Sequence, residues 1–142
     1  MPFSLDPQTM RAIIMDHYEY PRNKRVSNTA KYQKVHMDSE SCVDDIYVEM
    51  LLEDGTIQDL CFDGVACTIA TSSTSIMTEL LIGKTVEEAK VIMQNYFNMI
   101  DEKEYDEELL EEANVFKNTG KQANRIKCAT IGWNAVKEML GE

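Results

Sequence analysis

Four cysteines carry the most reactive side chains of this 142-residue chain: Cys42, Cys61, Cys67 and Cys128. The N-terminal stretch MPFSLDPQTM lacks the basic flank and apolar run of a signal peptide, so we expect a cytoplasmic protein. Thiols stay reduced in that compartment, and these cysteines are therefore expected to be free, metal-bound or reactive rather than paired in disulfides.

Two of the cysteines stand close to the start of an apolar helical pattern. Cys67 lies in FDGVACTIATSS, where a glycine-containing turn leads into a helix whose N-H groups and dipole would favour a thiolate. Cys128 follows the cations Arg125 and Lys127 and is predicted to open the last helix. Both positions suit a metal ligand or a nucleophile, and a buried structural thiol is the alternative for Cys67.

Cys42 lies in DSESCVDD, directly before a predicted hairpin, with Asp44 two residues further on and Asp45 beside it. A thiolate and a carboxylate at this spacing can bind one cation, because Zn²⁺ accepts sulfur at about 2.3 Å and carboxylate oxygen at about 2.0 to 2.2 Å. No spacing resembles the paired C-x-x-C arms of a zinc finger. One site shared by Cys42, Cys67 and Cys128 is one hypothesis, and three separate thiols are the other.

Cys61 is interpreted as a strand thiol without chemistry, since cysteine often packs as a small hydrophobe. Strict alternation along the predicted strand 56–62 places it on the same face as Ile57 and Asp59 and opposite Leu60. We leave it out of the predicted site.

The remaining pattern predicts the elements that position these residues. Apolar spacing, caps and breakers indicate helices over residues 7–20, 68–82, 85–97 and 128–140. Asp54 and Gly55 supply turn chemistry between the alternating segments 46–52 and 56–62, and residues 32–37 are a weaker strand candidate. We expect an α+β fold in a single domain over residues 1–142: a small antiparallel three-stranded sheet packed against about five helices, with a metal site at one end.

The charge balance argues against two classes of partner. Twenty-five acidic residues against fourteen basic ones give a net charge of −11, which opposes binding to nucleic acid or an anionic membrane. No run approaches the length of a membrane-spanning helix. The stretch DEKEYDEELLEE, residues 101–112, is either a solvated face or a docking surface for a basic partner.

Three segments together resemble the U-type iron-sulfur cluster assembly family. SESCVDD is similar to that family's N-P-T-C-G-D loop, FDGVACTIATSSTS to its F-x-G-x-G-C-x-x-x-x-A-S segment, and RIKCATIGW to its R-x-x-C-A-x-L-x-W ending. MDHYEYPRN also resembles the family's D-H-x-x-x-P-R-N opening, so the resemblance covers nearly the whole chain, from about Leu5 to Leu140. It implies a compact α+β domain whose three cysteines and one aspartate converge on a metal.

The family has two branches that bear on function. IscU-like scaffolds assemble a [2Fe-2S] cluster and usually have histidine before the last cysteine. SufU-like proteins have lysine there, carry an insertion before the final helix, bind zinc and accept sulfur from a cysteine desulfurase. Lys127 and the acidic segment 101–112 resemble the SufU-like branch.

The resemblance implies a set of zinc ligands: Cys42, Asp44, Cys67 and Cys128. Val43 and Ala66 stand where the family has glycine, which alone adopts φ > 0 without a Cβ penalty. A stiffer loop at Val43 leaves both Asp44 and Asp45 as candidate ligands.

The function implied by the resemblance is a zinc-dependent sulfurtransferase acting in iron-sulfur cluster biogenesis. A pyridoxal-phosphate (PLP)-dependent cysteine desulfurase forms a persulfide, Cys42 accepts the outer sulfur, and Arg125 supports the site or contacts the partner. Downstream iron-sulfur assembly proteins are the expected further partners. The alternatives are a scaffold that assembles a [2Fe-2S] cluster on the same ligands, and a structural zinc-binding domain without relay activity.

Overall fold

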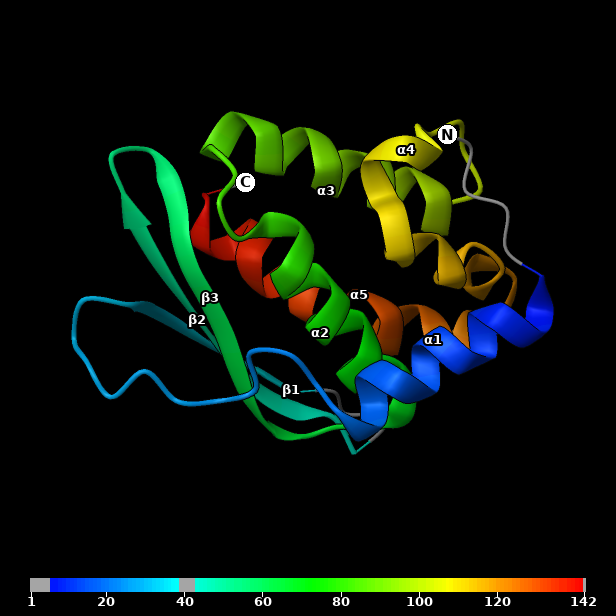
Figure 1. Ribbon diagram of the computed structural model, residues 1–142, viewed down its shortest axis with the longest axis horizontal. Helices are drawn as coiled ribbons and strands as arrows, with labels where there is room; N and C mark the ends of the chain where they lie inside the picture. The colour runs from blue at the N-terminus through cyan, green and yellow to red at the C-terminus, as the bar shows by residue number, and fades with distance from the viewer. Residues whose placement is uncertain (1–5, 39–42, 142) are drawn as a thin grey trace.

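The computed structural model describes residues 6–38 and 43–141 (Figure 1). Its helices and strands are α1 (Pro7–Glu19), β1 (Gln33–Asp38), β2 (Asp45–Glu53), β3 (Thr56–Val65), α2 (Thr68–Leu81), α3 (Val86–Ile100), α4 (Glu107–Leu110), the 3-10 helices η1 (Glu111–Phe116) and η2 (Thr119–Lys121), and α5 (Ala123–Met139). The predicted α+β fold, with a three-stranded antiparallel sheet and about five helices, is confirmed.

The sheet has the order β1-β2-β3, and its β2–β3 hairpin turns at Asp54 and Gly55, both with positive φ. Leu51 pairs with Asp59 whereas Leu52 pairs with Ile57, so one residue of β3 is left over as a bulge. The bulge reverses the alternation of faces, and Ile57 joins the core together with Leu60. The expectation that Ile57 shares a face with Cys61 is therefore wrong.

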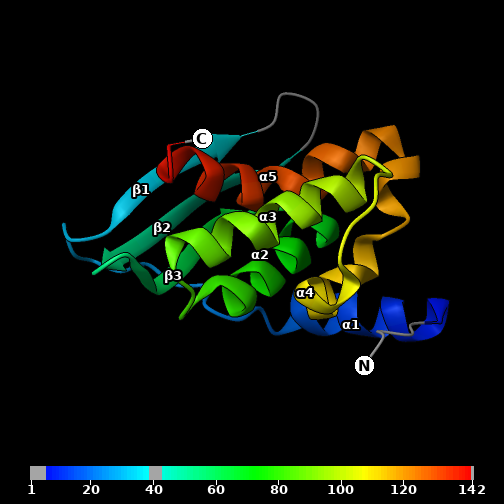
Figure 2. The same ribbon diagram turned by 90° about the horizontal axis from the view of Figure 1, so that it is seen from above.

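Two helices cover the apolar face of the sheet, with α2 packed against β3 and α5 against β1 and β2. The α2 helix also packs against α1, which lies at the end of the molecule far from the β2–β3 hairpin (Figures 1 and 2). Tyr96 of α3 stacks on Trp133 of α5 with ring centroids 3.8 Å apart, and its hydroxyl donates to the Ala129 carbonyl at 2.6 Å. These contacts fix α5 in the core.

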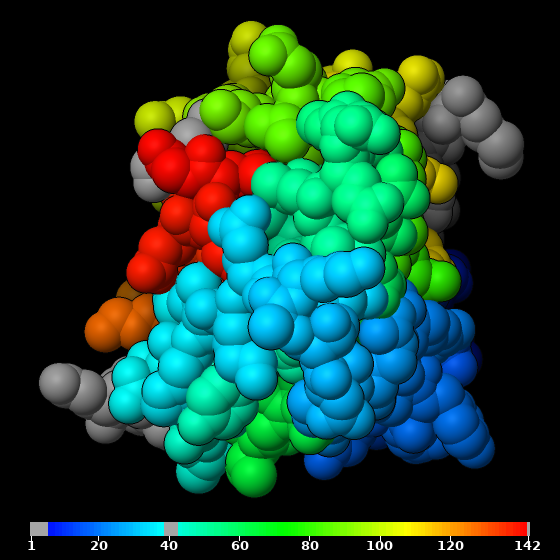
Figure 3. Space-filling view, turned by 90° about the vertical axis from the view of Figure 1, so that its left-hand side faces the viewer, coloured from blue at the N-terminus to red at the C-terminus, as the bar shows by residue number. Residues whose placement is uncertain are grey.

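Part of the other face of the sheet is covered by the chain between α1 and β1. Residues 23–25 run along β3, where the Phe62 N-H donates to the Asn23 carbonyl at 3.1 Å and the Arg25 N-H donates to the Phe62 carbonyl at 2.8 Å. The Ser27 hydroxyl then donates to Glu49 of β2. In Figure 3, which looks onto the left-hand side of Figure 1, the light-blue and cyan part of the chain fills the centre of the view. Polar side chains on this face are consequently buried under a loop rather than under helices.

The last helix is longer than predicted, because α5 begins at Ala123 rather than at Cys128. Cys128 is the sixth residue of α5, so the expectation that it opens the helix is wrong. The acidic segment 101–112 forms a turn, α4 and the start of η1, and its acidic side chains are mostly exposed, as a solvated face would be. Within the described residues, no helix is long and apolar enough to cross a membrane.

The backbones of β2 and β3 approach each other closely at Gly64, near the candidate site. A substitution there tests how strongly this contact constrains the sheet. Gly64 has φ +127°, and a Cβ there would overlap the Asp45 carbonyl oxygen. We predict that Gly64→Ala lowers the free energy of unfolding by roughly 2 to 4 kcal/mol, from strained φ and overpacking together. Urea unfolding measures the change.

The control variant is Gly55→Ala. Gly55 also has positive φ, +73°, but among the described residues, its chain neighbours aside, no atom lies within 4 Å of where its Cβ would stand. Its cost should be limited to about 1 to 2 kcal/mol of backbone strain. Equal losses in the two variants would show that the contact with Asp45 does not constrain the sheet.

Candidate metal centre

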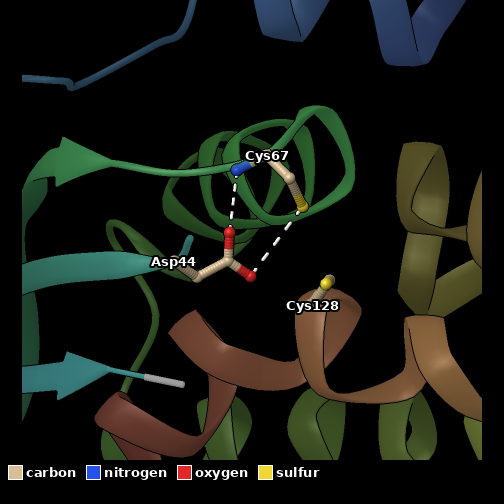
Figure 4. Close-up of side chains that lie close together, drawn as sticks. All are labelled: Asp44, Cys67 and Cys128. Atoms are coloured by element: carbon tan, nitrogen blue, oxygen red, sulfur yellow. Dashed lines mark hydrogen bonds between the residues drawn. The ribbon is translucent and has the colours of Figure 1, made fainter. Parts of the chain in front are cut away.

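Three elements bring a carboxylate and two thiols together at one end of the sheet. Asp44 directly precedes β2, Cys67 is the N-cap residue of α2, and Cys128 lies in the second turn of α5. Their side chains point toward one another (Figure 4), and one ligand atom from each lies within 4.8 Å of the other two. The hypothesis that separated cysteines share one site thus has a geometric basis for Cys67 and Cys128.

The contact between Asp44 and Cys67 joins the sheet to the N-terminus of α2. Oδ1 of Asp44 accepts the Cys67 N-H at 2.8 Å, and Oδ2 lies 3.8 Å from the Cys67 Sγ. The Cys67 Sγ in turn accepts the Ala70 N-H at 3.4 Å. Asp44 is only 2% exposed, so its carboxylate relies on such donors and on the positive end of the helix dipole.

The neighbouring carboxylate, Asp45, is directed elsewhere. Its Oδ1 pairs with the Nε2 of His36, and its side chain is 58% exposed. The His36 ring also stacks on Tyr47, with centroids 4.4 Å apart. Of the two candidate aspartates, Asp44 is therefore the one whose carboxylate faces the cysteines.

The donor set fits a zinc ion. Ligand atoms around a tetrahedral Zn²⁺ lie roughly 3.3 to 3.8 Å apart, given bond lengths of about 2.0 to 2.3 Å. The 3.8 Å between Asp44 Oδ2 and Cys67 Sγ meets this spacing without rearrangement. Cysteine thiolates are ligands that zinc and iron-sulfur clusters share. The predicted fourth ligand, Cys42, lies outside the described residues, and so its place in the site stays a prediction.

The surroundings of the two described thiols differ. Cys128 is 3% exposed and belongs to the core of α5, whereas Cys67 is partly accessible. A cleft of about 410 Å³ opens beside Cys67 and is lined by Arg125, which stands in the first turn of α5 with an exposed side chain. Lys127 is exposed as well. Arg125 thus lies where it can meet a molecule that approaches Cys67 through the cleft, and its predicted supporting role stays a prediction.

Cys61 lies apart from this cluster, on the sheet face that faces the chain between α1 and β1. It is fully buried and pairs in register with Glu49. Burial raises the pKa of the Cys61 thiol to about 11, so the thiol stays protonated at neutral pH. It is suited to packing, in agreement with its interpretation as a strand thiol.

The structure contains a second group of possible metal ligands that the sequence does not indicate. His17, Glu79 and Glu112 each place one ligand atom within 4.8 Å of the others. They come from α1, α2 and η1, and no local spacing links them in the sequence. Only the tertiary fold brings them together.

The structure defines a small α+β domain with a possible metal site formed by one aspartate and two cysteines, and comparisons with known proteins specify the family. The sequence profile described as "NifU-like N terminal domain" matches residues 9–141. The chain belongs to this family, and the predicted resemblance to U-type assembly proteins is confirmed.

Individual relatives come from both predicted branches. The chain is 36% identical over 140 residues to the "Zinc-dependent sulfurtransferase SufU" of Bacillus subtilis, covering 97% of this chain and 94% of the relative. It is 32% identical over 130 residues to the "Iron-sulfur cluster assembly scaffold protein IscU" of Streptococcus pyogenes, covering 91% and 80%.

A solved structure agrees with the fold. The crystal structure of a "Putative iron-sulfur cluster assembly scaffold protein for SUF system" from Fervidobacterium islandicum superimposes with a TM-score of 0.81 at 31% identity. It covers 90% of this chain and 93% of the other.

The different orientations of the two aspartates yield a test of the ligand set. We predict that Asp44→Asn lowers zinc affinity at least about tenfold, because a neutral amide replaces the charged carboxylate facing Cys67. Asp45→Asn makes the same chemical change at a side chain directed to His36 and should leave zinc affinity nearly unchanged. Competition with a chromophoric chelator measures both affinities. The reverse order of effects would assign the ligand role to Asp45.

Proposed function

We propose that this protein is a zinc-binding sulfur relay of iron-sulfur cluster biogenesis. The observation that carries the proposal is the cluster of Asp44, Cys67 and Cys128 in a chain of the NifU-like family. The chain's similarity to a zinc-dependent sulfurtransferase over 97% of its length supports the same role. In this role the single domain acts in the cytoplasm on a PLP-dependent cysteine desulfurase and delivers sulfur to downstream iron-sulfur assembly proteins.

The proposed zinc ligands are Asp44, Cys67 and Cys128 together with Cys42. A bound zinc ion keeps its cysteine ligands deprotonated at neutral pH, which is the state that both metal binding and nucleophilic attack require. Cys42 stands two positions before Asp44 in the sequence, so one short segment would supply two of the ligands.

The proposed acceptor is Cys42. Cys67 caps α2 and Cys128 belongs to α5, two helices held by the core, whereas Cys42 precedes the hairpin in the sequence. The Cys42 thiolate attacks the outer sulfur of the desulfurase persulfide, a new S-S bond forms to Cys42, and the old S-S bond breaks. The desulfurase cysteine leaves as a thiolate, so no outside oxidant or reductant is consumed.

Arg125 is proposed to assist from the rim of the cleft beside Cys67. Its guanidinium is exposed and always charged, so it suits either stabilisation of an incoming anionic persulfide or contact with an acidic partner side chain. In both cases its contribution is electrostatic.

A cluster scaffold is the second candidate, because thiolates also bind iron-sulfur clusters and because an IscU scaffold is 32% identical to this chain. Lys127 favours the relay. An imidazole at this position could add a metal ligand, whereas a solvated ammonium group does not bind a cation.

Removing the proposed acceptor tests the relay. We predict that Cys42→Ala abolishes transfer of labelled sulfur from a persulfidated desulfurase to this protein, because the attacking thiolate is absent. Mass spectrometry of the acceptor measures the transfer. Cys61→Ala is the matched control, because the Cys61 thiol is buried and protonated. The Cys61→Ala variant should accept sulfur like the wild type. Unchanged persulfide labelling of the Cys42 variant would exclude Cys42 as acceptor.

Metal content separates the three candidate functions. The relay predicts about one zinc per purified chain and strong stimulation of a cysteine desulfurase. Iron with acid-labile sulfide, and stable visible absorption after anaerobic reconstitution, would instead indicate the scaffold. Zinc without any stimulation, together with unfolding on chelation, would indicate a structural site.

A further inference from the structure

We propose that His17, Glu79 and Glu112 form a second cation site, for a divalent first-row transition ion. The three residues belong to α1, α2 and η1. Glu79 lies twelve residues after Cys67 on the same helix, which separates the two places by about 18 Å along α2. The inference is independent of the sulfur relay, since it uses none of that site's residues.

The imidazole of His17 is fixed in a ligand-like orientation. His17 is completely buried, and its Nδ1 lies 2.8 Å from the Ser75 Oγ. The same Oγ accepts the Arg22 N-H at 2.8 Å, so its second lone pair can accept a proton from Nδ1. In this tautomer the Nε2 lone pair is available to a cation, whereas in the other tautomer Nε2-H donates to Glu112 Oε1 at 3.1 Å. A metal-bound histidine typically has such an oxygen partner at its other ring nitrogen.

The carboxylates lie at distances that suit one ion. Oε1 of Glu112 is 3.1 Å from the His17 Nε2, and Oε1 of Glu79 is 3.8 Å from it. Ligand atoms around an ion with bonds of about 2.0 to 2.1 Å lie roughly 3.0 to 3.4 Å apart, so a small movement of Glu79 completes the spacing. Glu79 and Glu112 have side chains 47% and 44% exposed, which leaves them free to adjust.

The nearby arginine leaves most of the glutamate charge unbalanced. Arg22 donates from Nη2 to Asp16 at 2.6 Å and from Nη1 to the Tyr20 carbonyl at 3.0 Å. Its Nε is 3.9 Å from Glu79 Oε1, which is an ion pair beyond hydrogen-bond distance, so one arginine charge is shared among Asp16, Glu79 and Glu112. Because the guanidinium is engaged by Asp16, the pair Glu79 and Glu112 retains a charge that a divalent cation would neutralise.

The site has an entrance and room for further ligands. An open cavity of about 330 Å³ is lined by Glu79, Glu111 and Glu112 together with Ile76 and Leu80. The two carboxylates line this cavity, which leaves positions for water molecules, while the buried His17 nitrogen lies behind them, 3.1 Å from Glu112 Oε1. This mixed nitrogen and oxygen set suits Mn²⁺, Fe²⁺ or Zn²⁺, whereas the thiolates of the first site select softer partners.

That difference in ligand type permits a selective experiment. The full-length protein is loaded with one equivalent of zinc per chain, which the thiolate site takes up, and is then titrated with Mn²⁺ while free Mn²⁺ is measured by electron paramagnetic resonance. Zinc occupies the thiolate site, which manganese disfavours. The expected result is one tightly held Mn²⁺ per chain. No desulfurase is involved, so failure of the sulfur relay would not affect this readout.

Variants distinguish the site from diffuse binding to an acidic protein. Glu112→Gln and Glu79→Gln should each weaken Mn²⁺ binding about tenfold or more, and His17→Gln should abolish it. Glu138→Gln removes the same charge from an exposed position near the end of α5 and should leave binding unchanged. Absence of tight Mn²⁺ binding by the wild type, or equal binding by the Glu112 and Glu138 variants, would overturn the proposal. Both glutamate side chains are close to half exposed, so their variants should fold and these results stand even if His17→Gln fails to fold.

Discussion

The candidate site is governed by one electrostatic constraint: a carboxylate and two thiols lie within 4.8 Å of one another. The three groups cannot all be ionised in a partly dry pocket unless positive charge lies between them, because like charges oppose each other's ionisation. The N-H groups of Cys67 and Ala70 supply partial positive charge, to Asp44 and to the Cys67 sulfur respectively. A cation bound between the three groups would offset the remaining repulsion between them. This is the role proposed for the zinc ion.

The core keeps this cluster together by fixing the two helices that carry its thiols. A Cβ at Gly132 of α5 would lie 2.5 Å from the Thr74 Oγ1 of α2, so the two helices can be this close only because the residue is glycine. The Ser73 hydroxyl donates to the Ala129 carbonyl at 2.6 Å and accepts from the Trp133 indole at 3.1 Å. Cys67 and Cys128 are therefore held by two helices that pack closely against each other.

Local patterns predicted the elements well where one residue type determines the backbone. Asp54 and Gly55 located the hairpin, and the capping pair Thr85 and Glu88 located the start of α3. Sequence patterns failed to predict the local structure where tertiary contacts determine it. The bulge that returns Ile57 to the core depends on pairing with β2, and the polar first turn of α5 shows no apolar spacing. Adjacent aspartates also look equivalent in sequence, and only the fold directs Asp44 to the cysteines.

Ligand spacing bears on the choice between zinc and a binuclear cluster, which ligand softness leaves open. The described donors, from Asp44, Cys67 and Cys128, lie mutually within 4.8 Å, and one pair already has the separation of two ligands on the same tetrahedral ion. Ligands on different irons of a [2Fe-2S] cluster are spread more widely, because two metals and bridging sulfides lie between them. To hold such a cluster, the three described donors would have to spread apart. The spacing of the three described donors suits a single ion and is consistent with the proposed relay.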